Sequence, residues 1–457
     1  MPPGACLTTR GMQTEKLLTA EKATPRPRWP MRCIAAAALI GVGGTLLAGT
    51  GSLPPIHPRP TGNCPGSAAA YELSHDFFGG GGSFFDEAQW QYFTLPDPTG
   101  GPTSYLSHAD ALESGLLEEG DGWAVLRGGT RDASDASNPL RRSVRIHSRD
   151  AWDGREQGFL LEVGYTHVPH GCGVWPALWM YCDGSDLADA ADGRCGPWPQ
   201  NGEIDLLEFA NEFFSKTSLH FGADAQCRLN ATAVQECGPF LDKNGMGFDC
   251  ATEYFPAATD SLFPHPWAGP RYGCAPNRYD AWPTPKEINA APGTFVFEWS
   301  SSSMKVWNFP RSAVPADLAA GSPEPSTWDV GRMWSYYPLQ GCPTAREQLR
   351  PLNLVINIAY CGDWAGGDWE RQFDDGWVGR GFLFNWMQQL LGESCASKWG
   401  DFGGERSGGV GKLTQSGARQ ACNAFINARE SDAGVAEEAY FNFTRLRVYT
   451  ARGAARR

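Results

Sequence analysis

Short apolar runs separated by turn residues make up most of the chain from Tyr71 onward. Runs of this length that alternate with Gly- and Pro-rich segments predict β-strands joined by turns. The only good helical spacing lies between Thr414 and about Glu430, and a final strand is expected over Tyr440–Thr450. The pattern therefore predicts an all-β sandwich. Its clearest strands are expected at Phe159–Val163, Thr217–Phe221, Thr294–Trp299, Met304–Trp307 and Leu352–Ile358.

The octapeptide 201–208 places three carboxylates in a strand-like apolar run. In a regular strand Glu203 and Asp205 share one face, whereas Glu208 points to the other. A β-bulge at Leu206–Leu207 would bring Glu208 back beside Glu203, and bulges are frequent next to active sites. Two carboxyl groups on one wall are the minimum equipment for cleaving a glycosidic bond. From the octapeptide alone, a solvated strand face is an equal alternative.

Composition narrows the classes of partner. The net charge is -13, and no cluster of Lys and Arg is interleaved with aromatic residues, so a nucleic-acid surface is not expected. The 18 Trp, 13 Tyr and 24 Phe are numerous enough to supply both a core and a groove in which rings stack on sugars. No internal repeat is evident in the sequence.

Twelve of the fourteen cysteines follow the N-terminal region, which contains Cys6 and Cys33. None of them forms a Cys-x-x-Cys pair, the close spacing that zinc sites usually show. An even set at wide spacings favours disulfides in an oxidising compartment over metal ligands or free thiols. Cys182 with Cys195, which bracket an acidic loop, is the favoured local pair. The twelve are Cys64, Cys172, Cys182, Cys195, Cys227, Cys237, Cys250, Cys274, Cys342, Cys361, Cys395 and Cys422.

The N-terminus has the pattern of an export signal. Basic residues precede an uncharged apolar run from Cys33 to about Ala48, which is shorter than the ~20 residues that span a bilayer. Residues 1–51 are therefore interpreted as a basic segment with a signal peptide or a signal anchor, and 52–70 as a Pro/Gly-rich linker. Cleavage is favoured slightly over anchoring, and translation from Met31 would give an ordinary signal peptide. Residues 451–457 form a basic tail.

Several motifs resemble glycoside hydrolase family 16, and more narrowly the fungal laminarinase-type endo-β-1,3(4)-glucanases. The resemblance covers roughly Tyr71 to Tyr449, and several independent motifs in the right order make it specific. The motifs are Arg142–Arg145, Gly171–Trp179, Trp198–Glu208, Thr217–His220, Glu298–Trp299, Lys305–Arg311 and Cys361–Gly366.

The resemblance implies a β-jelly-roll, concanavalin A-like sandwich over residues 71–450, with a concave substrate cleft, disulfide-tied loop insertions and a retaining mechanism. It makes Glu203 the nucleophile and Glu208 the acid/base, with Asp205 between them tuning their protonation. This agrees with the chemistry of the octapeptide. Retention needs carboxyl groups about 5–5.5 Å apart, which same-face neighbours across a bulge can supply. A nearby carboxylate and partial burial would keep Glu208 protonated.

The resemblance also assigns substrate-binding residues. His220 matches a histidine of the cleft; without the resemblance, a satisfied core histidine would be preferred. Trp179, Trp198 and Trp364 match aromatic residues that stack on glucose, the alternative for each being core packing. Trp175 is assigned to the core. Arg145 resembles a substrate-contacting arginine, with a surface charge as an equal alternative.

Some segments depart from the family pattern or carry no strand signal. Ser104 stands where Asn is expected, which puts one polar subsite contact in doubt, and the stretch from Cys182 to Cys195 enlarges a loop beside the cleft. The seventy-odd residues between His220 and Phe295 are too long for a plain connection, and are interpreted as a disulfide-tied insertion that walls one end of the cleft. Asn230 begins a glycosylation motif on the surface, whereas the motif at Asn442 lies in an expected strand and is predicted to be unmodified.

The sequence thus predicts an exported endo-acting hydrolase of β-1,3- or mixed β-1,3/1,4-glucans. The alternatives are a cell-wall glucan transglycosylase and a non-catalytic glucan-binding module. The binding module is opposed by the three carboxylates, for which a pure binder has no use. The expected partner is a β-glucan polysaccharide, and the protein is expected to be a monomer that needs no cofactor and no metal. The predicted location is extracellular, either secreted or anchored as a type II membrane protein with the catalytic domain outside.

Overall fold

The computed structural model describes Cys64 and residues 70–453, apart from residues 80, 133–138, 183–194, 197, 214, 223–224, 243–246, 254–271, 279–282, 344–347, 372–392, 408–410, 429–434 and 436. Chain contacts divide the protein into residues 1–55 and 56–457, and every described residue belongs to the second unit. The N-terminal signal or anchor predicted within residues 1–51 lies outside the described residues. No described helix has both the length and the apolar composition needed to cross a bilayer.

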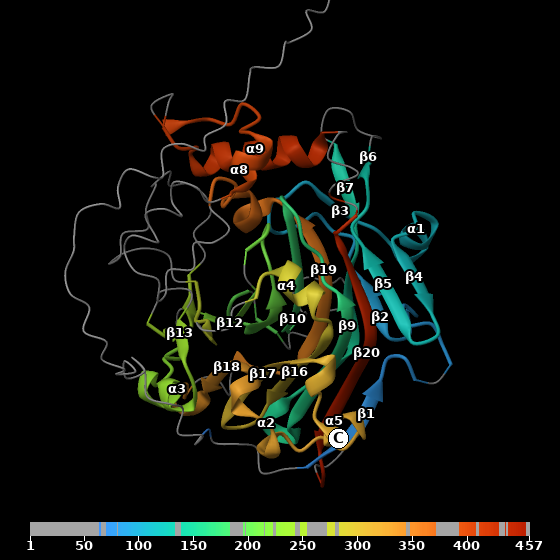
Figure 1. Ribbon diagram of the computed structural model, residues 1–457, viewed down its shortest axis with the longest axis vertical. Helices are drawn as coiled ribbons and strands as arrows, with labels where there is room; N and C mark the ends of the chain where they lie inside the picture. The colour runs from blue at the N-terminus through green and yellow to red at the C-terminus, as the bar shows by residue number, and fades with distance from the viewer. Residues whose placement is uncertain are drawn as a thin grey trace, which may run out of the picture. The chain divides into compact units, whose positions relative to one another are not determined.

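Most of the described strands belong to two large sheets, which confirms the predicted jelly-roll sandwich (Figure 1). The larger sheet has the order β13 (Phe240–Asp242), β15 (Pro276–Arg278), β18 (Met333–Pro338), β17 (Ser303–Pro310), β16 (Gly293–Trp299), β9 (Phe159–His167), β20 (Tyr440–Ala451), β5 (Trp123–Arg127) and β4 (Leu117–Gly120). A further strand, β1 (Tyr71–Asp76), pairs with β20.

The smaller sheet carries the motif residues. Its order is β14 (Ala251–Thr252), β12 (Lys216–Gly222), β11 (Glu203–Glu208), β10 (Val174–Tyr181), β19 (Leu352–Tyr360), β8 (Arg145–Trp152) and β2 (Trp90–Tyr92). The pairings are antiparallel except for β12 with β14. A third sheet contains β3 (Thr103–Tyr105), β7 (Leu140–Ser143) and β6 (Arg131–Asp132).

One core fills the space between the sheets. Residues two positions apart on several strands enter it, such as Leu178 and Met180 from β10 and Leu354 and Ile356 from β19, all fully buried. Such alternation is what a strand requires when one face packs on a partner sheet and the other does not. The intervening residues of β10, β11 and β12 are therefore free to line the opposite face of the smaller sheet.

The predicted helix forms at α9 (Gln415–Asn427). Thr414 caps its first turn by accepting a hydrogen bond from the Gly417 N–H at 2.9 Å. The disulfide between Cys361 and Cys422 attaches α9 to the end of β19. The other described helices are short, namely α1 (His108–Glu113), α2 (Gly154–Gln157), α3 (Ala231–Cys237), α4 (Pro285–Ala290), α5 (Ala316–Ala319) and α8 (Cys395–Trp399).

All twelve cysteines from Cys64 onward are paired, which confirms the disulfide interpretation and the local Cys182–Cys195 bridge. The insertion after His220 is held by three bridges, so its predicted disulfide ties are also confirmed. Asn230 is exposed and caps α3, whereas Asn442 lies within β20, as expected for the two glycosylation motifs. The remaining pairs are Cys64–Cys237, Cys172–Cys395, Cys227–Cys342, Cys250–Cys274 and Cys361–Cys422.

Candidate active site

The predicted bulge is present in β11. Asp205 pairs with Trp179 of β10 and Leu207 pairs with Leu178, so Leu206 is the extra residue. Pairing with β12 is likewise irregular between Asp205 and Glu208. The extra residue restores Glu208 to the face of Glu203 and Asp205, because it offsets the strand alternation by one position. A solvated strand face is wrong for Asp205, which is only 4% exposed.

The turn before β11 requires glycine. Gly202 has φ +71°, a conformation that residues with a side chain rarely adopt. A Cβ atom at this position would also lie 3.1 Å from the carbonyl oxygen of Gln348. Its neighbour Asn201 is buried and donates from Nδ2 to the Cys182 carbonyl at 2.9 Å. The turn at Gly202 and the hydrogen bond of Asn201 thus hold the segment that leads into Glu203.

Cross-strand register gives each carboxylate its neighbours. Glu203 pairs with His220 and Asp205 pairs with Ser218, both on β12. Glu208 pairs with Lys216 on β12 and with Ala177 on β10. Directly opposite residues on one face lie close enough to interact, so these pairs form a continuous polar surface across the smaller sheet.

Asp205 is the centre of a hydrogen-bond network. Its Oδ2 accepts from Ser218 Oγ at 2.6 Å and lies 3.1 Å from His220 Nε2. The other ring nitrogen of His220, Nδ1, lies 3.1 Å from Thr252 Oγ1 on β14. His220 therefore lies beside Asp205 with a partner on each ring nitrogen, and its role as a histidine of the cleft stays a prediction. Thr252 belongs to the insertion, so this segment contributes a contact to His220, and its role as a wall of the cleft stays a prediction.

Glu208 is held in a site that favours its protonated form. Burial and the charge of Asp205 raise its pKa to about 8, against the opposing effects of Lys216 and the Trp175 indole. Trp175 donates from Nε1 to Glu208 Oε1 at 2.7 Å. Burial also lowers the pKa of Lys216. The direction of this shift favours the protonated form of Glu208.

Glu203 has different donors. Trp198 is 36% exposed and donates from Nε1 to Glu203 Oε2 at 2.8 Å. Burial, Asp205 and Glu208 raise the pKa of Glu203, while Trp198 and Arg145 oppose this shift by favouring the ionised form. When Glu208 is protonated it carries no charge, so it no longer raises the pKa of Glu203.

Arg145 lies beneath the aromatic wall of the site. It is 3% exposed, and its Nη2 donates to the Tyr181 hydroxyl at 3.0 Å. Its guanidinium carbon lies 5.0 Å from the centre of the Trp179 ring, and Trp179 stacks on Tyr181 with 4.5 Å between ring centres. The surface-charge alternative for Arg145 is therefore wrong. Asn357 accepts from the Trp179 indole at 2.7 Å, which fixes the other edge of this ring.

The tryptophans near Glu208 make contacts that the sequence did not predict. Trp175 was assigned to the core, but it is half-buried and its N–H reaches Glu208. Its ring packs edge-on against that of Trp364, with 5.7 Å between centres. Trp364 in turn lies under the Lys216 ammonium at 4.6 Å. Trp175 thus packs against the small buried cluster of Ala210, Phe213 and Ala365, in part as predicted, while its indole N–H also reaches Glu208.

Sequence reasoning also did not single out Lys216, Ser218 or Tyr181. Lys216 and Ser218 alternate with His220 along β12, so the spacing of the recognised histidine contained the signal. Tyr181 follows Trp179 by two positions in the same way. Ser104 is a half-buried residue of β3, and its effect on a subsite contact stays a prediction.

Two groups of side chains in the described residues place three metal-ligating atoms within 4.8 Å of one another. One is Glu203, Asp205 and His220. In this group donors from outside the three residues contact both carboxylates, because Ser218 Oγ donates to Asp205 and the Trp198 indole N–H donates to Glu203. These contacts suit control of the protonation of the glutamates. The second group consists of His167, His170 and Glu438.

Comparison with known proteins decides the family. A model of the XgeA-like catalytic domain of glycoside hydrolase family 16 (GH16) matches residues 90–378. The chain belongs to GH16. It is 27% identical over 310 residues to a probable glycosidase of Schizosaccharomyces pombe, a match covering 65% of this chain and 61% of that protein. It is 28% identical over 288 residues to the endo-1,3(4)-β-glucanase xgeA of Emericella nidulans, covering 61% of this chain and 38% of that one.

Solved GH16 structures share the fold. Laminarinase 16A from Phanerochaete chrysosporium, solved with β-glucans in its donor and acceptor sites, is 23% identical with a TM-score of 0.53. A GH16 β-1,3-glucosyltransferase described as elongating is 22% identical with a TM-score of 0.54. Each match covers 83% of this chain and the whole of the solved chain. The chain spans less than two thirds of the length of each of the two curated relatives above.

Proposed function

We propose that the protein is an exported, endo-acting β-glucanase that hydrolyses β-1,3- or mixed β-1,3/1,4-glucans with retention of configuration. The observation that carries this proposal is the bulged strand β11, which presents Glu203, Asp205 and Glu208 on one face. Membership of GH16 and the similarity to fungal endo-1,3(4)-β-glucanases support the substrate class.

In the first step, the Glu203 carboxylate attacks the anomeric carbon of the sugar. Glu208 gives its proton to the departing glycosidic oxygen as the carbon–oxygen bond breaks, leaving a glycosyl ester on Glu203. The raised pKa of Glu208 supports the acid role, since it favours the protonated form. Each glutamate accepts one indole hydrogen bond, so the nucleophile role of Glu203 is carried over from its place in the GH16 motif, and Trp198 and Arg145 favour the ionised form that this role needs.

In the second step, Glu208 acts as a base. Having lost its proton, it accepts one from an incoming water as the water oxygen attacks the glycosyl ester and frees Glu203. Asp205 lies between the two glutamates, and its charge raises the pKa of each of them. We assign Asp205 to this control, with Ser218 and His220 holding its carboxylate in place.

Aromatic rings flanking the carboxylates suit a glucan chain, because each offers an apolar face to the C–H side of a glucose ring. We assign Trp198, Trp179 and Trp364 to glucose stacking and His220 to a sugar contact. Arg145 is buried behind Trp179 and Tyr181, so we assign it to holding these rings rather than to direct contact.

Export is supported by the disulfides. Six bridges link the described part of the chain, and bridges of this number form and persist in oxidising compartments. We infer that the enzyme acts on a β-glucan outside the cytoplasm, and that it does so as a monomer.

The test compares Glu203→Gln and Glu208→Gln on two substrates, laminarin and an aryl β-laminaribioside with a dinitrophenyl leaving group. On laminarin we expect both variants to lose activity, with Glu208→Gln lowering kcat by about 10²–10⁴-fold. On the aryl substrate, Glu208→Gln should still release the phenolate rapidly, because this group leaves without a proton. Glu203→Gln should release none. Glu118→Gln, at an exposed carboxylate of β4, is the matched control.

Proton NMR of the first product is the accompanying measurement, and retention requires the β-anomer to appear first. The α-anomer would contradict the mechanism. Wild-type protein that binds laminarin but releases no reducing ends would establish a binding module in place of an enzyme. Products longer than the substrate in the presence of an acceptor sugar would establish the transglycosylase, because a sugar would then replace water in the second step.

A further inference from the structure

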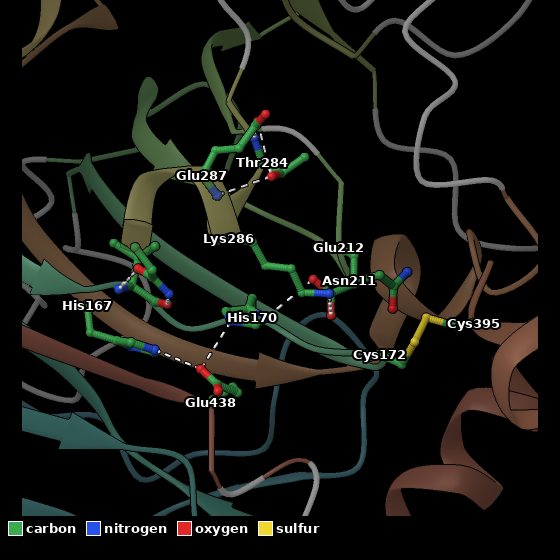
Figure 2. Close-up of polar contacts among 12 residues, drawn as sticks. His167, His170, Cys172, Asn211, Glu212, Thr284, Lys286, Glu287, Cys395 and Glu438 are labelled. Carbon is green, nitrogen blue, oxygen red and sulfur yellow. Dashed lines mark hydrogen bonds and ion pairs between the residues drawn. A yellow bond between two sulfur atoms is a disulfide. The ribbon is translucent and has the colours of Figure 1, made fainter. Parts of the chain in front are cut away.

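A second polar cluster lies where the ends of two long strands meet. His167 is the last residue of β9, His170 follows three positions later, and Glu438 precedes β20. Figure 2 shows the Glu438 carboxylate between the two imidazole rings. Glu438 Oε2 lies 2.9 Å from His167 Nε2 and 3.1 Å from His170 Nε2. One carboxylate oxygen therefore faces two ring nitrogens.

The second nitrogen of His167 fixes the tautomer of the ring. His167 Nδ1 lies 2.8 Å from the carbonyl oxygen of Tyr440, which can only accept a hydrogen bond. The hydrogen of a neutral ring is thus on Nδ1, and the lone pair of Nε2 points at Glu438. The ring is held by stacking on the Tyr440 ring, with 3.7 Å between centres and planes 4° apart.

The Nδ1 atom of His170 also faces an acceptor, which is the Glu212 carboxylate instead of a backbone carbonyl. His170 Nδ1 lies 3.3 Å from Glu212 Oε2, and both residues are 6% exposed. Neither of these two atoms makes a hydrogen bond to another residue that the structure describes. The outer oxygen of Glu212 is paired with Lys286 at 3.2 Å, which orients the carboxylate toward His170 (Figure 2).

The ring nitrogens of the cluster converge on few acceptor atoms. The four nitrogens of His167 and His170 face three acceptors, because Glu438 Oε2 faces both Nε2 atoms while the Tyr440 carbonyl and Glu212 Oε2 face the Nδ1 atoms. The two rings lie with 6.0 Å between their centres. A single divalent cation satisfies both Nε2 atoms and the Glu438 oxygen at once, because these three atoms already converge.

We propose that His167, His170 and Glu438 bind one transition-metal ion of the zinc type. Imidazole nitrogen with carboxylate oxygen is a ligand set typical of zinc. Bonds of about 2.0–2.1 Å in a tetrahedron separate neighbouring ligand atoms by about 3.3 Å. The observed separations of 2.9 and 3.1 Å therefore need only a small outward movement of the exposed Glu438 side chain.

The outer contacts match those of zinc-binding histidines. Such residues donate their second ring N–H to a backbone carbonyl or a carboxylate, which sets the tautomer and the ring orientation. Tyr440 and Glu212 occupy these two positions. A pocket of about 190 Å³ adjoins His170 and Glu438, so a water molecule has room to complete the coordination. The bound ion would join the end of β9 to the start of β20.

The experiment measures zinc binding by tag-free, chelator-stripped full-length protein, using calorimetry, with Co²⁺ absorption as a probe of four-coordinate geometry. Wild type should bind one equivalent of Zn²⁺ and unfold at a higher temperature with it. Glu438→Gln should lose this binding and this stabilisation. Glu212→Gln leaves all three ligands in place and should lower the affinity by about 10–100-fold.

Two controls separate this site from others. Glu87→Gln removes an exposed carboxylate that faces another histidine, His108, at 3.6 Å, and should bind Zn²⁺ as wild type does. Glu203→Gln tests the carboxylates of β11 and should also bind as wild type. Absence of saturable binding to wild type, or unchanged affinity in both Glu438→Gln and Glu212→Gln, would overturn the proposal. Loss in Glu203→Gln alone would place the ion at β11 and overturn it too. Should Glu438→Gln not fold, Glu212→Gln still decides.

Discussion

Each of the two glutamates of the site accepts a hydrogen bond from one indole N–H group. Trp198 donates to Glu203 and Trp175 donates to Glu208. A hydrogen bond to an ionised carboxylate stabilises that form and lowers the pKa, so its removal raises the pKa. Each tryptophan therefore sets the pH at which one glutamate changes charge, in addition to any contact it makes with a sugar.

This gives a pH-dependence prediction for kcat/KM. The acidic limb requires ionised Glu203, so Trp198→Phe should move that limb to higher pH. The alkaline limb requires protonated Glu208, so Trp175→Phe should move that limb to higher pH. Each shift should be about one unit, the size expected for loss of one hydrogen bond to a charged group. Trp123→Phe, at an exposed position, is the control. Movement of the same limb in both variants would contradict the assignment.

Single residues of the site were predictable where a motif contained them. Glu203, Asp205 and Glu208 are close in the sequence, and strand alternation plus one bulge was enough to place them together. The partners of these carboxylates were not predictable in this way. Trp175 and Lys216 reach Glu208 from neighbouring strands, and which residues face each other depends on a register that the sequence does not state.

The bulge in strand β11 gives a prediction about the activity of deletion variants. Without Leu206 the strand reads Glu-Ile-Asp-Leu-Glu, in which all three carboxylates share a face by regular alternation. Deletion of Leu206 should therefore leave measurable laminarinase activity, lowered by about 100-fold if the glutamates are misplaced by about 1 Å. Deletion of Ile204 should reduce activity to background, because it moves Glu203 to the opposite face.

Thermal unfolding of both deletion variants shows whether the sandwich still forms, since each removes one buried side chain from the same strand. Equal activities in two folded variants would show that side-chain parity does not govern the site. Strands themselves were well predicted because their apolar runs are long, as in β9, β16 and β19. Helices such as α1 and α4 were missed, because six residues are too few to establish a helical period.

Across the whole domain, the disulfides divide into long-range and local bridges. Cys172–Cys395 spans 223 residues, whereas Cys182–Cys195 spans 13. Closing a longer loop removes more entropy from the unfolded chain, about 5 against about 3 kcal/mol in the chain-entropy model. The long-range pairs could not be predicted, because twelve cysteines allow many connectivities and the sequence contains no distances.

Replacing both cysteines of a bridge by serine should separate stability from binding. The Cys172/Cys395 double variant should lower the unfolding temperature more than the Cys182/Cys195 variant. The Cys182/Cys195 variant should have the larger effect on KM for laminarin. Its bridge lies just before Trp198 in the chain, and the carbonyl oxygen of Cys182 accepts the hydrogen bond from Asn201. Calorimetry and initial rates on the two proteins make the comparison. A larger KM change in the Cys172/Cys395 variant would contradict it.

The pairing of β1 with β20 leaves the two ends of the domain side by side. Tyr71 faces Ala451, and the Arg452 N–H donates to the Ala70 carbonyl at 2.8 Å. A few glycines would suffice to join residue 70 to residue 452 in a circular permutant that starts in a surface turn, and Cys237→Ser would accompany this change because Cys64 is left out. For the same reason, a partner fused at residue 70 and one fused at residue 452 would emerge from the same corner of the sheet.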